Sequence, residues 1–341
     1  MRAWQLADDT GAGFLRLVSL PDPVPGPLEV VVQTRAVALN YRDLVVARGG
    51  YQGRVPVGAV PCSDAAGEVV AIGRDVSALR VGDRVTSVFA PDWVAAGPTR
   101  AALRTTLGAG HAAGVLAELV TLPASAVLPM ASSLTFEEAA TLPCAALTAW
   151  HALFEAGVCG AGQSVLTLGT GGVSVFAAQF ACAAGASVVA TSSDHQKLER
   201  LRALGVAHGI NYRDEPAWGE RVRALTAQGE GVDLVVEVGG QGSLEQSMRA
   251  VRPGGTIALV GTLAGPAPVN LAPLFLRNIR LQGILVGSRD MFARMNVAIA
   301  RWRIRPVIDR VFGFEAAPEA FAHLAGGTHL GKVVVRVGDP A

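Results

Sequence analysis

The sequence predicts an α/β chain in two parts, a β-rich barrel-like part and a doubly wound parallel sheet. Three observations predict it. The stretch up to Leu122 consists of short β-like runs separated by turn residues. From Pro123 on, apolar runs alternate with helix-like segments. A glycine-rich turn, Gly169-Thr-Gly-Gly-Val173, follows one of these apolar runs in mid-chain. With 341 residues, two domains are expected.

Composition favours a globular protein. Hydrophobic residues make up 50% and charged residues 17%, which suits buried cores and argues against long disorder. The net charge of +1 gives no electrostatic reason to expect nucleic acid or an acidic membrane as partner. The start, Met1–Asp9, lacks the apolar core of a signal peptide, so we expect a soluble cytoplasmic protein. The four cysteines form no Cys-x-x-Cys pair, which argues against disulfides and structural zinc.

The β-rich part is predicted from runs of β-branched and apolar residues between prolines and glycines. The expected strands are Leu15–Leu20, Glu29–Leu39, Gly67–Ile72 and Arg84–Phe89. The tail from about Val307 returns to β character and ends in a run of valines after Lys332.

The second part alternates strands and helices. A helix is expected through Ala140, with Ser133 as its cap, and another over Thr148–Ala156. Further helices are expected over Val175–Ala184 and Asp194–Leu204. The expected strands are Ser164–Gly169, Ser187–Thr191, Gly209–Tyr212, Asp233–Val238, Thr256–Gly261 and Leu281–Val286. Their continuous apolar character indicates a parallel sheet buried on both faces.

The glycine turn indicates a dinucleotide. Gly169 lets the chain leave its strand sharply, because glycine tolerates backbone angles that a Cβ disfavours. Gly171 permits close approach of a pyrophosphate, whose charge the N-terminus of the following helix favours, and Gly172 and Val173 are expected as further cofactor contacts. Ser174 takes the third fingerprint position and is small enough for helix–strand packing. Strand, turn, helix and strand together predict a dinucleotide-binding unit.

Several further motifs carry a family resemblance. They are Ala38-Leu-Asn-Tyr-Arg-Asp43, Cys62-Ser-Asp-Ala-Ala-Gly67, Val81-Gly-Asp-Arg-Val85, Leu142–Trp150 and His329-Leu-Gly-Lys-Val-Val334. With the glycine turn, they make the chain resemble the medium-chain dehydrogenase/reductase superfamily, in its zinc-independent quinone oxidoreductase-like branch. The resemblance implies a GroES-like catalytic domain of residues 1–122 and 307–341 and a Rossmann NADP-binding domain of residues 123–306. It also implies a homodimer that pairs the segment Leu281–Gly287 edge to edge.

The resemblance identifies the positions at which the zinc branch of the superfamily has its metal ligands. Aligned on these motifs, the three ligand positions of the zinc branch hold Asn40, Ser63 and Cys144. Catalytic zinc needs about three protein ligands, so one thiol is not expected to retain it. Cys144 is interpreted instead as a small buried residue. Phe89–Ala113 contains no cysteine for a structural zinc. We therefore predict no metal.

The predicted cofactor is NADPH, with NADH the less favoured alternative. Ser192 occupies the position where NAD enzymes of this fold carry an acidic residue, and Ser193 follows it. A hydroxyl can donate a hydrogen bond to a 2′-phosphate, and Lys197 and Tyr212 resemble the pair that flanks it in quinone oxidoreductases. Asp194 is interpreted as a helix cap. Further cofactor contacts are expected from Thr148, Gly239, Gly261, Leu263, Val286 and Ser288.

The expected reaction is hydride transfer from NADPH to a small acceptor, either a quinone or an α,β-unsaturated carbonyl. Without a metal, hydrogen-bond donors must stabilise the developing oxyanion, and the resemblance points to Asn40, Tyr51 and Arg289. Asn40 is expected to donate to the substrate or to the nicotinamide ribose, Tyr51 to stack on a flat substrate or supply a proton, and Arg289 to reach the substrate or the cofactor. Asp43 and Asp64 are interpreted as structural, and with no evident acid, water protonates the product. Two alternatives stay open: a zinc-type alcohol dehydrogenase using NAD(P), and a non-catalytic NADPH-binding protein.

Overall fold

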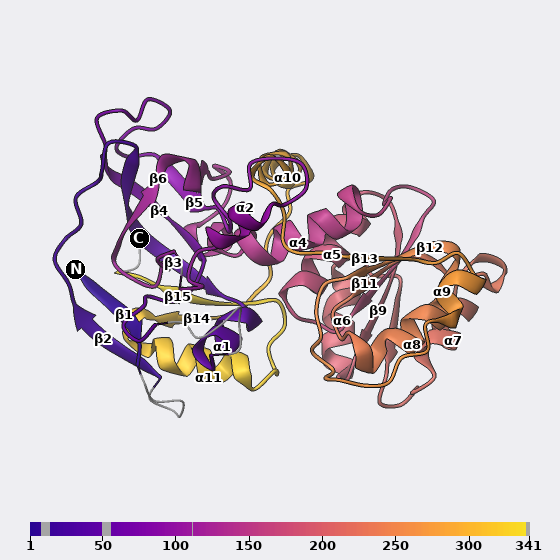
Figure 1. Ribbon diagram of the computed structural model, residues 1–341. Coiled ribbons are helices and arrows are strands. Elements are labelled where there is room, and N and C mark those ends of the chain that lie inside the picture. Colours follow the sequence, from indigo (N-terminus) through magenta and orange to yellow (C-terminus); the bar gives the residue numbers. More distant parts are fainter. Residues whose placement is uncertain (8–13, 50–55, 111, 339–341) are drawn as a thin grey trace. The chain divides into compact units, whose positions relative to one another are not determined.

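The chain folds into two compact units in the computed structural model, which describes residues 1–7, 14–49, 56–110 and 112–338 (Figure 1). The first unit comprises Met1–Ala145 and Ser288–Ala341, and the second comprises Ala146–Gly287. The predicted β-rich part and the predicted parallel sheet are both present.

The unit boundaries differ from the expected ones at 122/123 and 306/307. Residues 123–145 stay with the first unit because β7 (Val127–Pro129) pairs with β5 (Arg84–Ser87). Residues 288–306 join it because the backbone N–H of Arg289 donates to the carbonyl of Trp93 at 2.9 Å. These contacts join residues distant in the chain, so the change of rhythm at Pro123 did not mark the boundary.

The first unit is built on a seven-stranded sheet in the order β14-β15-β3-β4-β5-β7, with β6 also paired to β3. A separate ribbon pairs β1 with β2. The elements not yet bounded are β1 (Arg2–Leu6), β2 (Leu15–Ser19), β3 (Glu29–Leu39), α1 (Tyr41–Ala47), β4 (Asp64–Ile72), α2 (Arg100–Arg104), β6 (Leu119–Pro123), a 3-10 turn (Ala124–Ala126), α3 (Phe136–Ala140), α10 (Arg289–Trp302), β14 (Ile308–Gly313), a 3-10 turn (Phe314–Ala316), α11 (Ala317–Ala325) and β15 (Lys332–Arg336).

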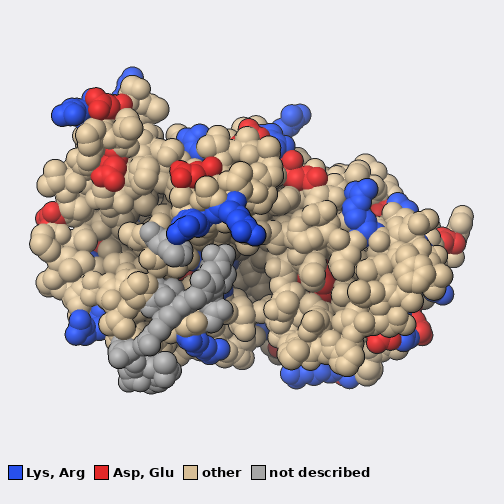
Figure 2. Space-filling view, viewed as in Figure 1, with Lys and Arg blue, Asp and Glu red and all other residues tan. Residues whose placement is uncertain are grey.

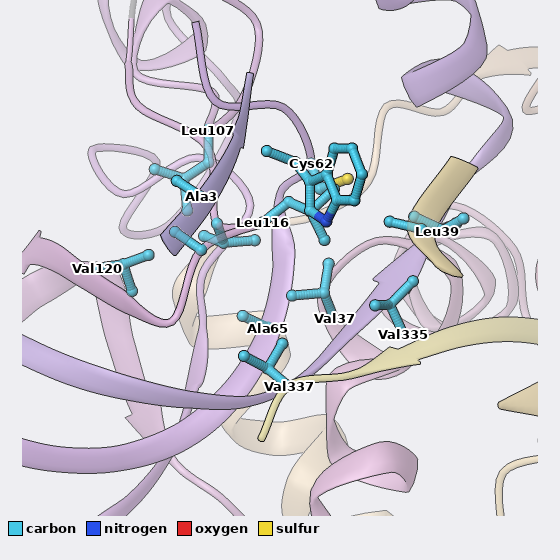
Figure 3. Packing of buried hydrophobic residues seen from close by; sticks show 14 of the residues in the cluster. Ala3, Val37, Leu39, Cys62, Ala65, Leu107, Leu116, Val120, Val335 and Val337 are labelled. Atoms are coloured by element: carbon cyan, nitrogen blue, oxygen red, sulfur yellow. The ribbon is translucent and has the colours of Figure 1, made fainter. Parts of the chain in front are cut away.

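The core of this unit forms where small and β-branched side chains of β3, β4 and β15 meet (Figure 3). Val37, Ala65 and Val335 are among its fully or almost fully buried members. Because β15 pairs antiparallel with β3, the C-terminal end of the chain completes the sheet begun near the N-terminus. This explains why residues from both chain ends form one unit.

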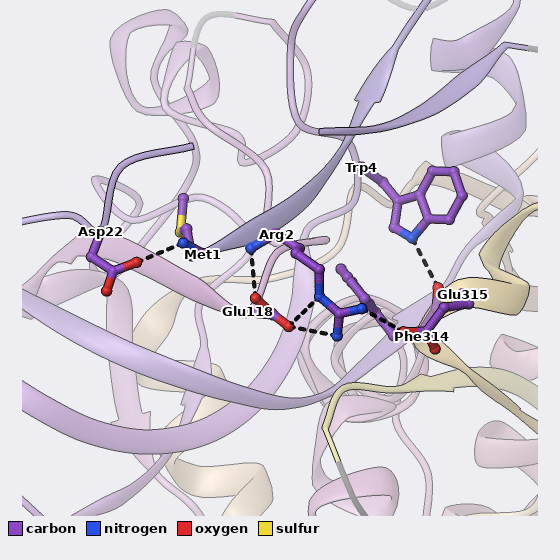
Figure 4. A network of polar contacts seen from close by, with 7 residues as sticks. All are labelled: Met1, Arg2, Trp4, Asp22, Glu118, Phe314 and Glu315. Carbon is purple, nitrogen blue, oxygen red and sulfur yellow. Dashed lines mark hydrogen bonds and ion pairs between the residues drawn. The ribbon is translucent and has the colours of Figure 1, made fainter. Parts of the chain in front are cut away.

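A polar network fastens the first strand to distant segments (Figure 4). The Arg2 guanidinium forms ion pairs with Glu118 at 2.7 Å and Glu315 at 2.6 Å. The Trp4 indole donates to the carbonyl of Phe314 at 2.8 Å.

The cap of α3 corrects one sequence expectation. The N-cap is Thr135, not Ser133: its hydroxyl accepts the N–H of Glu138 at 3.2 Å, and the Glu138 carboxyl accepts the N–H of Thr135 at 2.9 Å. Ser133 stands three positions before Phe136, whereas Thr135 stands three positions before Glu138, which is the spacing of a capping box.

The second unit is a six-stranded parallel sheet in the order β10-β9-β8-β11-β12-β13. The chain enters it through a helical run over Leu142–Ala146, α4 (Leu147–Trp150) and His151–Glu155. Its other elements are β8 (Ser164–Leu168), α5 (Gly172–Ala183), β9 (Ser187–Ser192), α6 (His195–Ala203), β10 (His208–Asn211), α7 (Trp218–Ala224), a 3-10 turn (Ala227–Gly229), β11 (Val232–Glu237), α8 (Gln241–Ala250), β12 (Val251–Leu259), α9 (Ala272–Leu276) and β13 (Arg280–Gly283).

This strand order reverses direction between β8 and β11, since the chain moves outward from β8 to β10 and then returns to add β11 beside β8. In open α/β sheets, ligands bind outside the carboxyl ends of the strands at such a switch point. We therefore expect a ligand to bind at the loops that follow β8, β9 and β11.

No helix among the described residues is long and apolar enough to cross a membrane. On the face of the molecule in Figure 2, acidic and basic side chains are interspersed across a mostly uncharged surface.

Candidate functional site

The glycine turn after β8 forms an open cradle. Gly169 has φ of 71°, in the left-handed region, as its sharp exit from the strand requires. Gly171 is the N-cap of α5, and no side chain caps that helix end. A Cβ placed on Gly169 or Gly171 would meet no described atom within 4 Å. The exposed backbone at Gly171, Gly172 and Val173 therefore fits an anionic group at a helix N-terminus.

Ser174 holds this turn from behind. Its side chain is buried, and its hydroxyl donates to the carbonyl of Leu168 at 2.6 Å. The serine thus fastens the first turn of α5 to the end of β8, a bond that the more usual glycine cannot make.

Ser192 and Tyr212 lie side by side at the carboxyl edge of the sheet. The register pairs Ser192 with Asn211, and the N–H of Tyr212 donates to the carbonyl of Ser192 at 3.0 Å. The Tyr212 side chain is 41% exposed, so it is available to a ligand. Ser193 follows, half-buried, and Lys197 lies in the first turn of α6.

Asp194 caps α6, as the sequence predicts. Its carboxyl accepts the N–H of Gln196 at 2.7 Å and that of Lys197 at 3.2 Å. Its own N–H donates to the hydroxyl of Ser192 at 3.2 Å. The acidic side chain is thereby turned toward the helix backbone.

Glu237, at the end of β11, is a site residue that the sequence analysis missed. It is fully buried, and its carboxyl accepts the N–H of Gly239 at 2.7 Å, the N–H of Gly240 at 3.0 Å and the hydroxyl of Ser243 at 2.6 Å. The hydroxyl of Ser247 donates to its other oxygen. One carboxyl group therefore shapes the turn after β11. The signal was present, since a glutamate interrupts an apolar strand directly before two glycines.

The loop after β12 lies against this turn. The N–H of Leu263 donates to the carbonyl of Val238 at 3.1 Å, and Leu263 is 52% exposed. A Cβ on Gly240 would stand 2.7 Å from the carbonyl oxygen of Gly261, so the close approach requires glycine. Gly239, Gly261 and Leu263 thus lie close together in the loops after β11 and β12, and their contact with a cofactor stays a prediction.

Val286, beyond β13, is strained. Its φ is 37°, which is rare for a β-branched residue. Its carbonyl lies 2.8 Å from Nδ1 of His151, which must donate because the carbonyl can only accept. Such strain is characteristic of ligand sites. The sequence analysis did not assign His151 a role; Thr148, on the same helical run, is buried.

Two predicted site residues, Ser288 and Arg289, lie in the first unit and have other partners. The Ser288 hydroxyl caps α10 by accepting the N–H of Met291 at 3.2 Å. The Arg289 guanidinium donates to the carbonyls of Ser125 at 3.1 Å and Val127 at 3.5 Å. Both residues anchor α10, which sequence spacing did not reveal. Tyr51 lies outside the described residues.

Asn40 follows β3 and lies beside a buried lysine. Asn40 is 8% and Lys332 3% exposed. The Lys332 ammonium donates to Oδ1 of Asn40 at 2.5 Å and to the carbonyl of Leu39 at 2.7 Å. Among the described residues, Nδ2 of Asn40 is buried and has no acceptor. Lys332 was not predicted as a site residue.

Two buried carboxyl groups surround this pair. Asp43 accepts the backbone N–H of Asn40 at 2.8 Å. Asp64 accepts the hydroxyl of Ser63 at 2.6 Å and the backbone N–H of Cys144 at 3.0 Å. Burial raises the pKa of Asp43 to about 6. These contacts agree with the structural interpretation of both aspartates.

The cysteines of the first unit have protonated thiols. Burial, with a smaller contribution from the charge of Asp64, raises the pKa of Cys144 to about 12. Burial also raises the pKa of Cys62 well above its usual range. Since the thiolate is the nucleophile, neither thiol is prepared for nucleophilic attack at neutral pH.

Comparison with known proteins gives the family. Residues 26–132 match the model of the alcohol dehydrogenase GroES-like domain, and residues 172–301 match that of zinc-binding dehydrogenases. A zinc-type alcohol dehydrogenase-like protein of Schizosaccharomyces pombe is 40% identical over 96% of this chain and 97% of its own. The 2-methylene-furan-3-one reductase of Solanum lycopersicum is 30% identical over 98% of this chain and 79% of its own.

A solved structure agrees with this. A putative alcohol dehydrogenase from Sinorhizobium meliloti superposes with a TM-score of 0.90 at 43% identity, covering 98% of both chains. The chain therefore belongs to the medium-chain dehydrogenase/reductase superfamily, a family of oxidoreductases that bind a nicotinamide cofactor. The glycine cradle and the strand order of the second unit fit that cofactor.

Proposed function

We propose that the protein is an NADPH-dependent, metal-free reductase that transfers hydride to a quinone or an α,β-unsaturated carbonyl. The observation that carries the proposal is the chemistry at the three positions where the zinc branch has its ligands. Asn40 is bound to a lysine, Ser63 donates to Asp64, and only Cys144 offers a side chain of a type that zinc commonly binds.

These three residues do not suit zinc. Zinc in proteins is held by thiolate, imidazole or carboxylate groups. An amide oxygen already bound to an ammonium and a buried serine hydroxyl are poor substitutes. The Lys332 ammonium also brings a positive charge to this position, which disfavours a divalent cation nearby. We derive no catalytic step through a metal.

Asn40 is the donor that we assign to the reaction. When bound, NADPH would supply a hydride to the β-carbon of an enone or to a quinone, and negative charge would then develop on the acceptor oxygen. A donor aimed at that oxygen stabilises the developing charge. Nδ2 of Asn40 is a buried donor without an acceptor among the described residues. Water supplies the proton that completes the product.

The preference for NADPH rests on the edge after β9. Ser192 offers a hydroxyl in place of a carboxylate, Tyr212 lies next to it, and Lys197 lies in the first turn of the following helix. With Asp194 turned to the helix backbone, a 2′-phosphate meets fewer competing negative charges. The tomato relative, by its name a reductase of an unsaturated ketone, supports the acceptor class.

The test is consumption of NADPH by the purified protein with a quinone panel and an enone panel, together with metal analysis. We expect turnover that survives a strong zinc chelator. Alcohol-dependent reduction of NAD(P) that the chelator abolishes would establish the alternative, zinc-type alcohol dehydrogenase. Tight NADPH binding without turnover of any acceptor would establish the non-catalytic alternative.

Cofactor choice is tested separately. Lys197→Ala should raise the KM for NADPH about tenfold, equivalent to about 1.4 kcal/mol, and leave that for NADH unchanged. Ser192→Asp should weaken NADPH more, because it adds a charge of the same sign as the phosphate. Arg200→Ala, on the exposed side of the same helix, is the matched control. Equal effects on both cofactors would refute the assignment.

The protein is further proposed to form a homodimer through β13. This strand ends the sheet order, and near it Phe275 and Leu276 of α9 are 71% and 72% exposed. An unpaired strand edge is a template for pairing with a second copy. Light scattering should give the mass of a dimer, and a monomer at micromolar concentration would overturn this.

A further inference from the structure

The pairing of β15 with β3 places a lysine beside Asn40. The antiparallel register sets Val333 opposite Leu39, so the next residue on each side, Lys332 and Asn40, also face each other. Asn40 leads directly into α1, and Lys332 begins β15. Residues almost the whole chain apart thus meet through the sheet itself.

The chemistry of this contact fixes the orientation of the Asn40 side chain. An ammonium group has only donors, so the amide atom that faces it must be the oxygen. Oδ1 lies 2.5 Å from the Lys332 ammonium. The amide nitrogen must then point away from the lysine, and its two hydrogens find no acceptor among the described residues.

The backbone of Asn40 is fixed as well. Asp43 accepts its N–H at 2.8 Å, and the carbonyl of Leu39 accepts the same lysine at 2.7 Å. The backbone N–H of Asn40 and its side-chain oxygen are thus both hydrogen-bonded. The amide nitrogen is the group of this residue that can still bind a ligand. A buried donor without a partner is unfavourable, and a bound acceptor would remove that cost.

We propose that Lys332 is a positioning residue that holds the Asn40 carboxamide with its nitrogen as donor toward the acceptor oxygen of the substrate. The inference rests on the proposed function, because it gives Asn40 a carbonyl or quinone oxygen to bind. Lys332 is one of only two lysines in a chain that has 29 lysine and arginine residues in total. A compact ammonium on a flexible stem fits between two oxygens, where a planar guanidinium would need more room.

The first experiment distinguishes the loss of the amide donor from a loss of folding stability. Asn40→Asp keeps an oxygen for Lys332 and replaces the donor nitrogen with a second oxygen. We expect its melting temperature to equal or exceed that of the unmodified protein, while kcat falls at least about a hundredfold, as for loss of an oxyanion donor. Unchanged kcat in a folded Asn40→Asp protein would overturn the proposal.

The second experiment is a double-mutant cycle in kcat. Lys332→Met should lower kcat about tenfold, because the carboxamide is then free to turn. The same change in an Asn40→Ala background should lower kcat less than about twofold. Arg336→Gln is the matched control on β15, since it removes a 2.7 Å bond to Glu137 without touching Asn40. Equal losses of kcat in both backgrounds would show a merely structural lysine and overturn the proposal.

A third measurement does not depend on turnover. The chain has five asparagines, so selective ¹⁵N labelling gives few side-chain NH₂ signals, and Asn40→Asp identifies that of Asn40. Lys332→Met should shift and broaden or double this signal, and Arg336→Gln should not. If no quinone or enone is reduced, the proposed function fails while this measurement still tests the lysine. An Asn40 signal unchanged by Lys332→Met would overturn the positioning role itself.

Discussion

The carboxyl group of Glu237 should be essential to the turn that follows β11. Four donors converge on it: the N–H groups of Gly239 and Gly240 and the hydroxyls of Ser243 and Ser247. Glu237→Ala removes all four acceptor contacts from a fully buried position. Glu237→Gln keeps one oxygen and replaces the other with an NH₂ group.

The magnitude follows from what each donor can do afterwards. The two hydroxyls can rotate to other acceptors, and that of Ser243 already lies 3.3 Å from the carbonyl of Gly240. The two backbone N–H groups cannot turn, and each unsatisfied buried group costs about 1–3 kcal/mol. Glu237→Ala should therefore destabilise the second unit by about 4 kcal/mol. Glu237→Gln should cost about 1 kcal/mol, because its oxygen can serve the N–H groups while the Ser247 hydroxyl accepts from its NH₂ group.

Thermal unfolding measures this difference. At about 3 °C per kcal/mol for a unit of this size, Glu237→Ala should lower the melting temperature by about 12 °C and Glu237→Gln by about 3 °C. Glu230→Ala, at an exposed glutamate of the same unit, is the control. NADPH should bind more weakly to the alanine variant than to the glutamine variant. The turn at Gly239 and Gly240 lies at the strand ends where we propose that the cofactor binds. Equal melting temperatures for the two Glu237 variants would refute the reasoning.

Three further outcomes follow from single contacts. Burial raises the pKa of Asp43 to about 6, so the folded state binds more protons than the unfolded state between about pH 4 and 6, and stability falls as pH rises through that range. Asp43→Asn should remove this pH dependence in urea titrations, and its persistence would contradict the assignment. His151→Phe removes the bond to Val286 and should raise the KM for NADPH several-fold without changing the melting temperature by more than about 4 °C; an unchanged KM would deny His151 a positioning role. Ser174→Ala should cost about 1 kcal/mol and Ser174→Gly about 2, because glycine also lowers helix propensity, and calorimetry that ranks them in reverse would refute this.

Much of the second unit could be predicted because its signals are local. The strand β8, the glycine turn and α5 follow one another without a break, and Asp194 precedes the helix that it caps. Once the alternation of strands and helices was clear, the parallel sheet and its binding edge followed from general rules of the fold. Ser192 ends β9 and Tyr212 directly follows β10, which is the neighbouring strand, so the two residues lie side by side.

Contacts between residues far apart in the chain could not be predicted from the sequence. Arg289 follows the last strand of the sheet in sequence, yet its guanidinium binds carbonyls more than a hundred residues earlier. The cap of α3 is a different case, because Thr135 and Glu138 have the capping-box spacing in the sequence itself and only Thr135 makes the capping bonds. Periodicity and motif spacing carry no information on the long-range contacts of Arg289.

Lys332 shows how a functional residue can escape sequence reasoning while remaining physically intelligible. In the chain it stands before a run of valines and is indistinguishable from a strand-end charge. Its meaning comes from the register, which sets it opposite Asn40, and from burial, which leaves its ammonium only the oxygens of Asn40 and Leu39 among the contacts described. A buried ammonium requires such partners, because an unpaired charge in the interior is costly. The pair thereby links the closure of the first sheet to the orientation of one amide group. A substitution that shifts the register of β15 against β3 should therefore change the orientation of the Asn40 side chain. It should leave the strand ends of the second unit, where we propose that the cofactor binds, less affected.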